Sequence, residues 1–359
     1  KRFDKGERMA YSREEAAEFI IKAGYALVEK GLIARTWGNI SARLSDTEFL
    51  VTPSGMGYDR LTPDKLVVCK ISDCSYEGEI KPSSEKGVHG EAYKYRPDVN
   101  FVIHTHQLYA TAVGTTGKSL SARTAEEEKI LGADVISAKY AISSTRHLMR
   151  NVSDAIQKNT ASNAFFMRYH GVLCLGRDYD HAFAVSETLE DICKDIICRK
   201  DQLIVDEIRM TDPGTIAQSL GISLDDLQAL VDKTGKKSLL LDTSKVVEDI
   251  AGIETKIYPM IDDMAQIAGV RFLCLAPADG TFLTKAESQL QKKTCVFIRG
   301  IGALCLASDP EEAEAVAMVL EKNCLAYAYG RRQGEYAHLG LLDAALQRNT
   351  YVKKYSKLK

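Results

Sequence analysis

Apolar residues near the start of the chain recur every three to four positions. This spacing predicts an amphipathic helix from Ser12 to about Lys30, with one face turned toward the core. Ser12 and Glu15 form a capping-box pattern at its beginning, and Gly31 is the residue expected to end it. The core-facing positions of this helix are Ala16, Phe19, Ile20, Ala23, Leu27 and Val28.

Shorter apolar runs, some with alternating apolar and polar positions, predict strands. They lie at residues 49–51, 66–71, 99–106, 164–175, 295–298 and 303–306. We expect residues 164–175 to form one continuous buried strand that contains His170. Helical patterns cover residues 12–30, 108–113, 148–158, 178–200, 222–232, 244–253 and 310–329.

The segment 81–106 brings together several residues suited to chemistry. His104 and His106 alternate onto one face of the predicted strand, so their imidazoles point the same way and can meet one cation. Just upstream, Ser83-Ser84 opens a predicted helix with Glu85 in its first turn, and a helix start offers donors to an anion. A single His-x-His is more often two ordinary strand histidines. The neighbouring serines and the acid favour a metal site beside an anion site.

The end of the first half recurs in the second half. The pattern Gly-x-Leu-Cys-Leu at residues 171–175 returns at residues 302–306, an offset of 131. The same register continues without a gap through the pairs Asp178/Asp309, Ala182/Ala313, Ala184/Ala315, Val185/Val316, Leu189/Leu320, Glu190/Glu321 and Cys193/Cys324. We therefore predict a duplicated unit and two domains, residues 1–205 and 206–359.

The second copy is predicted to lack the metal ligands. In the 131-residue register, Ile301 falls opposite His170. Aligning Val113-Gly114 with Ala268-Gly269 places Pro259-Met260-Ile261 opposite residues 104–106. None of these side chains carries a group that zinc prefers, so we expect the second domain to be structural.

Composition narrows the classes of partner and compartment. Lys and Arg number 47 against 49 Asp and Glu, which gives no electrostatic case for nucleic acid or for an acidic membrane surface. No run reaches the ~18–20 apolar residues of a membrane span. The nine cysteines lie mostly in apolar segments and form no Cys-x-x-Cys, as expected in a reducing compartment. The charged start, residues 1–5, has no apolar stretch behind it, so we expect no signal peptide and a cytoplasmic protein.

Five short motifs follow one another along the first half. They are Gly38-Asn39-Ile40-Ser41, Thr52-Pro53-Ser54-Gly55, Pro82-Ser83-Ser84-Glu85, His104-Thr105-His106 and Tyr169-His170-Gly171. Over roughly residues 12–200, their order and spacing make the chain similar to the class II aldolase/adducin family, the group of L-fuculose-phosphate and L-rhamnulose-phosphate aldolases. The resemblance implies an α/β fold, a three-layer α/β/α sandwich around a mixed sheet. The second half resembles a shortened, degenerate copy of the same domain.

The resemblance also implies site residues and a reaction. His104, His106 and His170 match the three zinc ligands of the family, which implies one Zn²⁺ per chain, in the first domain. Glu85 matches the acid that ligates the resting metal and serves as the base. The phosphate-binding positions are matched by Gly38, Asn39, Ser54, Gly55, Ser83 and Ser84. The implied activity is retro-aldol cleavage of a phosphorylated ketose to dihydroxyacetone phosphate and an aldehyde, in a homo-oligomer with its sites near subunit interfaces.

The sequence departs from the aldolases in one catalytic position. They use a tyrosine as proton donor after the His pair, whereas residues 119–130 contain none, and Tyr140 resembles a different family position. Sugar-phosphate 4-epimerisation, dehydration or decarboxylation on the same metal therefore stay open as sibling reactions. Glu85 favours the aldolases over the epimerases, which carry Asp there. A third alternative, an adducin-like binding protein without catalysis, suits the ligand-free second half but not the complete His set of the first.

Overall fold

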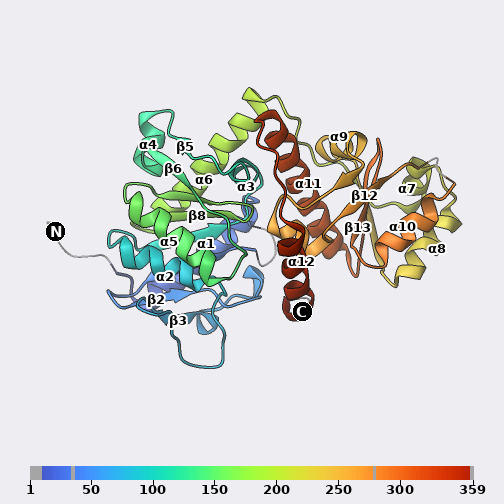
Figure 1. Cartoon of the computed structure of the whole chain (residues 1–359). Coiled ribbons are helices and arrows are strands. Elements are labelled where there is room, and N and C mark those ends of the chain that lie inside the picture. The colour runs from blue at the N-terminus through green and yellow to red at the C-terminus, as the bar shows by residue number, and fades with distance from the viewer. Residues whose placement is uncertain (1–9, 34–36, 278–279, 356–359) are drawn as a thin grey trace. The chain divides into compact units, whose positions relative to one another are not determined.

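The computed structural model describes residues 10–33, 37–277 and 280–355 (Figure 1). The chain divides into two compact units, the first ending at Cys193 and the second beginning at Lys194. The charged segment at residues 1–5 lies outside the described residues.

A mixed eight-stranded sheet forms the centre of the first unit. Its strands are β1 (Asn39–Arg43), β2 (Glu48–Val51), β3 (Val67–Lys70), β4 (Phe101–Thr105), β5 (Leu120–Ser121), β6 (Asp134–Ala138), β7 (Ala164–Met167) and β8 (Gly171–Gly176). They lie in the order β3-β2-β1-β4-β8-β7-β6-β5, with β6 and β7 parallel and the other neighbours antiparallel. The strand β4 is therefore central, between β1 and β8.

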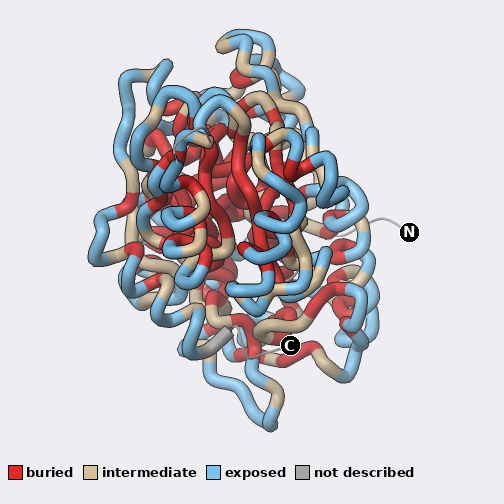
Figure 2. Tube along the Cα trace, turned by 90° about the vertical axis from the view of Figure 1, so that its right-hand side faces the viewer, coloured by how far each residue is buried: buried red, intermediate tan, exposed pale blue. Residues whose placement is uncertain are grey.

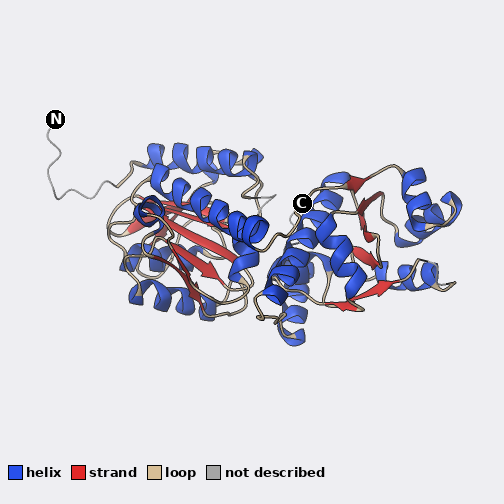
Figure 3. Ribbon diagram, turned by 90° about the horizontal axis from the view of Figure 1, so that it is seen from above, coloured by secondary structure: helices blue, strands red, loops and turns tan. Residues whose placement is uncertain are grey.

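Helices cover both faces of this sheet, as the view from above shows (Figure 3). They are α1 (Arg13–Glu29), α2 (Lys86–Tyr95), α3 (Leu108–Gly114), α4 (Ala125–Leu131), α5 (Arg146–Lys158) and α6 (Tyr179–Asp195), with 3-10 turns at Tyr58–Arg60 and Pro63–Lys65. The helices α2 and α5 pack together on one face through Ala92 and Val152, over Phe165 and Leu173. On the opposite face, Tyr179 of α6 contacts Phe101 of β4. All five residues of β4 are buried because both faces are covered.

The predicted first helix is confirmed. Both halves of the capping box between Ser12 and Glu15 are present, and the helix ends just before Gly31, which has a φ of 68°. Its buried stripe contains Ala16, Ile20, Ala23 and Leu27, with Phe19 partly covered. The inclusion of Val28 was wrong: its side chain is 45% exposed, because it lies one position beyond the stripe that faces the sheet.

The prediction of a single strand at residues 164–175 was also wrong. The segment forms a hairpin, in which β7 and β8 run antiparallel and Met167 pairs with Gly171. The turn contains Tyr169 with a φ of 65°, and the N–H of His170 donates to the carbonyl of Met167 at 2.8 Å. Both strands are fully buried, so hydrophobicity does not change at the turn. His170 thus lies in the turn and not inside a strand.

The second unit has a six-stranded sheet in the order β11-β12-β13-β14-β10-β9. Its strands are β9 (Arg209–Met210), β10 (Ser238–Asp242), β11 (Lys256–Ile257), β12 (Phe272–Leu275), β13 (Cys295–Ile298) and β14 (Gly302–Ala307). Its helices are α7 (Pro213–Leu220), α8 (Leu224–Thr234), α9 (Lys245–Ile253), α10 (Phe282–Leu290), α11 (Pro310–Arg332) and α12 (Leu341–Thr350), with π-helical turns at Ile196–Lys200, Met264–Ala268 and Tyr351–Tyr355. The sequence patterns did not reveal α7 or β10.

The six strands repeat a pairing scheme found in the first unit. There, β1, β4, β8, β7, β6 and β5 are neighbours in that order, and β9, β10, β14, β13, β12 and β11 follow it. In both series, the fourth and fifth strands are parallel and the other neighbours antiparallel. The first unit has two further strands, β2 and β3, beyond β1.

The strand registers overturn the predicted alignment of the His pair. His104 lies opposite Leu173 in the first unit, and Leu241 lies opposite Leu304 in the second. Because Leu173 and Leu304 occupy the same place in the repeated Gly-x-Leu-Cys-Leu motif, the position of His104 is taken by Leu241. The alignment with residues 259–261 was therefore wrong. It rested on the match of Val113-Gly114 with Ala268-Gly269, two short segments that the strand registers do not place in equivalent positions.

Burial follows the sheets, which run through the interior behind helices with exposed outer turns (Figure 2). All nine cysteines are free thiols, and seven of them are buried, in agreement with the prediction that most lie in apolar segments. Among the helices described, none combines the length and the hydropathy needed to cross a membrane.

Candidate active site

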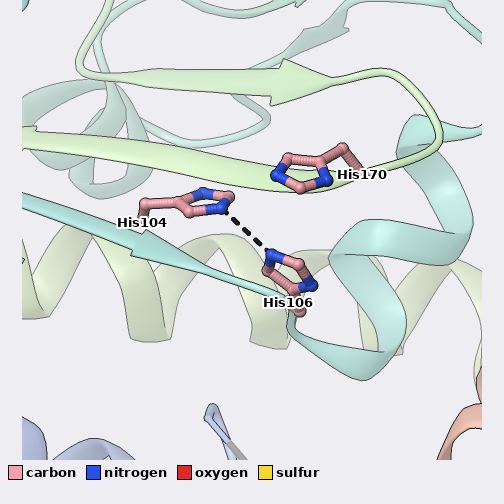
Figure 4. Close-up of side chains that lie close together, drawn as sticks. All are labelled: His104, His106 and His170. Atoms are coloured by element: carbon pink, nitrogen blue, oxygen red, sulfur yellow. Dashed lines mark hydrogen bonds between the residues drawn. The ribbon is translucent and has the colours of Figure 1, made fainter. Parts of the chain in front are cut away.

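Three histidines meet where β4 ends and β8 begins. Because these strands are antiparallel, with Thr105 opposite Val172, the residues that leave β4 lie beside those that enter β8. His104 and His106 come from the end of β4 and His170 from the turn before β8, and their rings point toward one another (Figure 4). The three ring centroids lie 4.6–5.0 Å apart.

The arrangement of the three rings fits a metal ion. One ligand nitrogen from each of His104, His106 and His170 lies within 4.8 Å of the others. The Nδ1 of His104 lies 2.8 Å from the carbonyl oxygen of Val172, to which it donates, so in the neutral form of the ring, the form that binds a metal, the lone pair of Nε2 faces the centre. That Nε2 lies 3.0 Å from Nε2 of His106. The three residues could therefore hold a divalent ion with one coordination position left open.

The close approach of these strands requires a glycine. A Cβ at position 171 would lie 2.3 Å from the carbonyl oxygen of Thr105 and 3.2 Å from ring atoms of His104 and His106. Any side chain at Gly171 would thus push the two strand ends apart and separate the histidines.

Glu85 lies directly against this group. Its Oε2 is 3.1 Å from Nε2 of His104, its Oε1 is 2.8 Å from Nε2 of His170, and its side chain is 8% exposed. Burial alone would raise the pKa of Glu85, but the charges and hydrogen bonds of His170 and His104 hold that pKa well below its ordinary value. Glu85 is therefore ionised.

The predicted position of Glu85 in the helix needs a small correction. The helix α2 begins at Lys86, and Glu85 is its N-cap residue, with φ −104° and ψ 11°. The Glu85 side chain makes no capping hydrogen bond to the helix, because its carboxylate is turned to the histidines. The backbone N–H of Glu85 instead meets the hydroxyl of Ser83 at 3.2 Å. Ser83 and Ser84 therefore precede the helix.

A buried chain of hydrogen bonds leads to the Glu85 carboxylate. Asn39 Nδ2 lies 3.3 Å from Glu85 Oε2, and Asn39 Oδ1 lies 2.5 Å from Nε2 of His89. The other ring nitrogen, Nδ1 of His89, lies 2.6 Å from the hydroxyl of Ser41, which lies 2.7 Å from the Tyr93 hydroxyl. Glu85 at the N-cap and His89 and Tyr93 within α2 recur every four residues, so all three side chains lie on the same side of the helix.

The chemistry of these groups determines which atom donates and which accepts in the hydrogen bonds from Glu85 to Ser41. An ionised carboxylate only accepts, so Asn39 must turn its NH₂ to Glu85 and its oxygen to His89. Nε2 of His89 then carries the proton, and Nδ1 accepts from Ser41. Burial, and next the charge of His104, lower the pKa of His89 to about 3, so the ring stays neutral. His89 thus orients the amide that orients Glu85. The sequence patterns did not reveal this link through Asn39.

We expect His89→Leu to destabilise the first unit by about 2 kcal/mol or more. The substitution leaves the Asn39 carbonyl and the Ser41 hydroxyl buried without their partner, and each such group costs about 1–3 kcal/mol. Urea unfolding would measure the change. The control is His147→Leu, because His147 is exposed on α5. Equal stability of the two variants would contradict the role of the buried chain.

Of the predicted phosphate positions, Asn39 begins β1, and the others lie on loops that backbone hydrogen bonds join. The N–H of Ser54 donates to the Lys81 carbonyl and that of Ser83 to the Thr52 carbonyl, both at 2.9 Å. Gly38 has a φ of 97°, and a Cβ there would lie 2.4 Å from the carbonyl oxygen of His104. Gly55 has a φ of 73°. The hydroxyl of Ser84 lies 2.9 Å from that of Ser144. The side-chain amide of Asn39 is already engaged by Glu85 and His89.

Comparison with known proteins finds relatives of the first unit. Residues 18–197 match the family described as Class II Aldolase and Adducin N-terminal domain. L-fuculose phosphate aldolase of Escherichia coli K12 is 30% identical over 201 residues, which cover 56% of this chain and 87% of that protein. The enzyme of the same name from Methanococcus maripaludis is 27% identical over 180 residues, 50% of this chain and 94% of the relative.

A solved structure of L-fuculose 1-phosphate aldolase is also similar. It is 31% identical, with a TM-score of 0.49, over 55% of this chain and 91% of that one. The L-fuculose-1-phosphate aldolase of Thermus thermophilus is 26% identical, with a TM-score of 0.45, over 52% of this chain and 94% of that one. Through residues 18–197, this chain belongs to the class II aldolase and adducin N-terminal domain family.

Proposed function

We propose that the protein is a zinc-dependent aldehyde-lyase that cleaves a phosphorylated ketose to dihydroxyacetone phosphate and an aldehyde. The observation that carries this proposal is the contact of the buried Glu85 carboxylate with His104 and His170, two members of a group that could hold a metal. A scaffold protein without catalysis would not need an ionised carboxylate placed against three converging imidazoles, since buried charge costs free energy. The similarity to L-fuculose phosphate aldolases supports the same choice.

In this proposal, each group of residues has one task. His104, His106 and His170 hold the divalent ion, and three histidine ligands suit Zn²⁺. When bound, the ion supplies Lewis-acid chemistry by withdrawing charge from the oxygens of the ketose. The ionised Glu85 would accept the proton that the substrate hydroxyl loses when the C–C bond breaks and would return it to the carbon next to the carbonyl, and Asn39 holds Glu85 in place.

The phosphate group is proposed to bind between Gly38-Asn39, Ser54-Gly55 and Ser83-Ser84. Turns of this kind present N–H and O–H donors without net charge. We expect Ser84→Ala to weaken the affinity for a phosphorylated ketose by about tenfold, in keeping with one lost hydrogen bond to a charged group. The measurement is KM together with inhibition by inorganic phosphate. The control is Ser219→Ala in the second unit, and an unchanged KM in Ser84→Ala would remove Ser84 from the cradle.

A sibling reaction is the second candidate. No tyrosine occurs between Ser119 and Ile130, where the aldolases have their proton donor. Sugar-phosphate 4-epimerisation, dehydration or decarboxylation would use the same metal and the same phosphate cradle. A screen of phosphorylated ketoses with separate detection of dihydroxyacetone phosphate, epimer and carbon dioxide decides between these reactions.

We further propose that the second unit is a shortened copy of the first unit that carries out no chemistry. In this proposal it shields the pocket of a first unit, in the same chain or in a neighbour, from water. The protein is proposed to be a homo-oligomer in the cytoplasm. Leu241 and Ile301 occupy the strand and turn positions of His104 and His170. The repeated strand scheme supports a common origin of the two units.

We expect a chain truncated after residue 205 to keep its metal but to aggregate or lose activity. Removal of the second unit would expose apolar surface that it covers in the proposed oligomer. Metal content, light scattering and turnover are the measurements. A truncated protein that is soluble, metal-bound and fully active would show that the second unit is dispensable.

A further inference from the structure

A pocket in the second unit is lined by positive charge. Its volume is about 460 Å³, within the range of about 300–1,000 Å³ typical of small-molecule sites. The lining residues are Gly269, Val270, Arg271, Lys292, Lys293, Leu341 and Arg348. Four of these seven residues are cationic and none is acidic.

Several other cations of the same unit form ion pairs with carboxylates: Arg209 with Glu321, Lys233 with Glu287, Lys245 with Asp249, Lys322 with Asp263, and Arg331 with Glu254. Within the described part of the chain, no carboxylate lies within ion-pair distance of the four pocket cations. Their charge is therefore not neutralised by a carboxylate of the described residues.

Neutral groups hold two of these cations in place. Arg348 donates to the carbonyl oxygens of Gln266 and Ile267 at 2.6 and 2.8 Å. Lys293 Nζ donates to Gln289 Oε1 at 2.8 Å and lies 5.1 Å from the centre of the Phe272 ring. Burial lowers the pKa of both side chains, and the charges of Arg271 and Lys292 lower that of Lys293 further. The fold thus keeps together cations that repel one another.

We propose that this pocket binds a small organic anion carrying one or two phosphate groups. Like charges gathered in a partly buried cavity cost free energy, and an anion that binds there removes the repulsion. The side chains of Val270 and Leu341 offer an apolar wall for the organic part. The site shares no residue with the phosphate cradle of the first unit. A small ligand fits better than nucleic acid, because the chain has a net charge of −2 and the positive charge is confined to one cavity.

Hydrogen–deuterium exchange of the full chain, with and without inorganic pyrophosphate, tests the proposal. Pyrophosphate should protect backbone amides in residues 264–272, 289–294 and 341–350. The double substitution Arg271→Gln/Lys292→Gln should raise the half-saturating concentration about tenfold, since it removes two exposed charges. Neither side chain is hydrogen-bonded to a described residue, so exchange in β13 and β14 should stay unchanged. If exchange in these two strands changes, the measurement is repeated with the single substitution Lys292→Gln.

Two matched variants complete the experiment. Lys237→Gln/Lys256→Gln removes the same charge from exposed positions outside the pocket and should leave the midpoint unchanged. Arg271→Lys/Lys292→Arg conserves the charge and should retain binding. The proposal fails if Arg271→Gln/Lys292→Gln binds like the parent, if protection occurs only at residues 38–40, 52–55 and 81–85, or if chloride at equal ionic strength protects equally. It also fails if a single-stranded oligonucleotide protects the pocket at lower concentration than pyrophosphate.

Discussion

Glu85→Gln is expected to lower kcat by about 10²–10⁴-fold while the metal content stays at the parental level. Glutamine has the same shape and can still accept from Asn39 Nδ2, but it cannot exchange a proton. The three imidazoles that could hold the ion are untouched. Release of dihydroxyacetone phosphate measures turnover, and elemental analysis of the purified protein measures the metal.

The matched control for this variant is Glu79→Gln. Glu79 is exposed and lies outside the site, so the same change of charge should leave both readouts at the parental level. Near-parental turnover in Glu85→Gln would refute the assignment of the catalytic carboxylate. A loss of metal in Glu85→Gln would show instead that Glu85 acts chiefly as a ligand.

His106→Ala is expected to lower metal affinity by more than about 100-fold, because even the loss of an outer partner of a ligand costs about 10–100-fold. His106 is the member of the triad that follows β4, and its Nε2 lies 3.0 Å from that of His104. Its removal leaves two imidazoles, and turnover should fall with the metal content. Titration of the metal-free protein with Zn²⁺, followed by competition with a chelator, measures the affinity.

His147→Ala serves as the control, because His147 is exposed on α5 and far along the chain from the His104–His106 pair. Chelator treatment of the parent should abolish turnover, and added Zn²⁺ should restore it. Full metal content in His106→Ala would contradict a site built from the three histidines. Restoration by Mg²⁺ but not by Zn²⁺ would contradict the choice of zinc.

Local patterns in the sequence determined the parts of this protein that depend on near neighbours. The helix α1 begins after the capping box of Ser12 and Glu15 and ends just before Gly31, as predicted. Both ends could be predicted because helix ends are set by a few adjacent residues. The period of two in β4 was enough to bring His104 and His106 together. The motif spacing predicted the family that the comparisons show, and its three histidines and Glu85 do meet in space.

Tertiary structure decided what depends on contacts between distant segments. Residues 164–175 are apolar throughout most of their length, so only strand pairing shows the turn that delivers His170 to the other two histidines. Only the register of β10 against β14 shows that Leu241, and not residue 259, 260 or 261, takes the place of His104. The orientation of Asn39 follows from Glu85 and His89, which lie 46 and 50 positions away along the chain. Periodicity records which residues are buried, whereas a hydrogen bond between remote side chains leaves no periodic trace in the sequence.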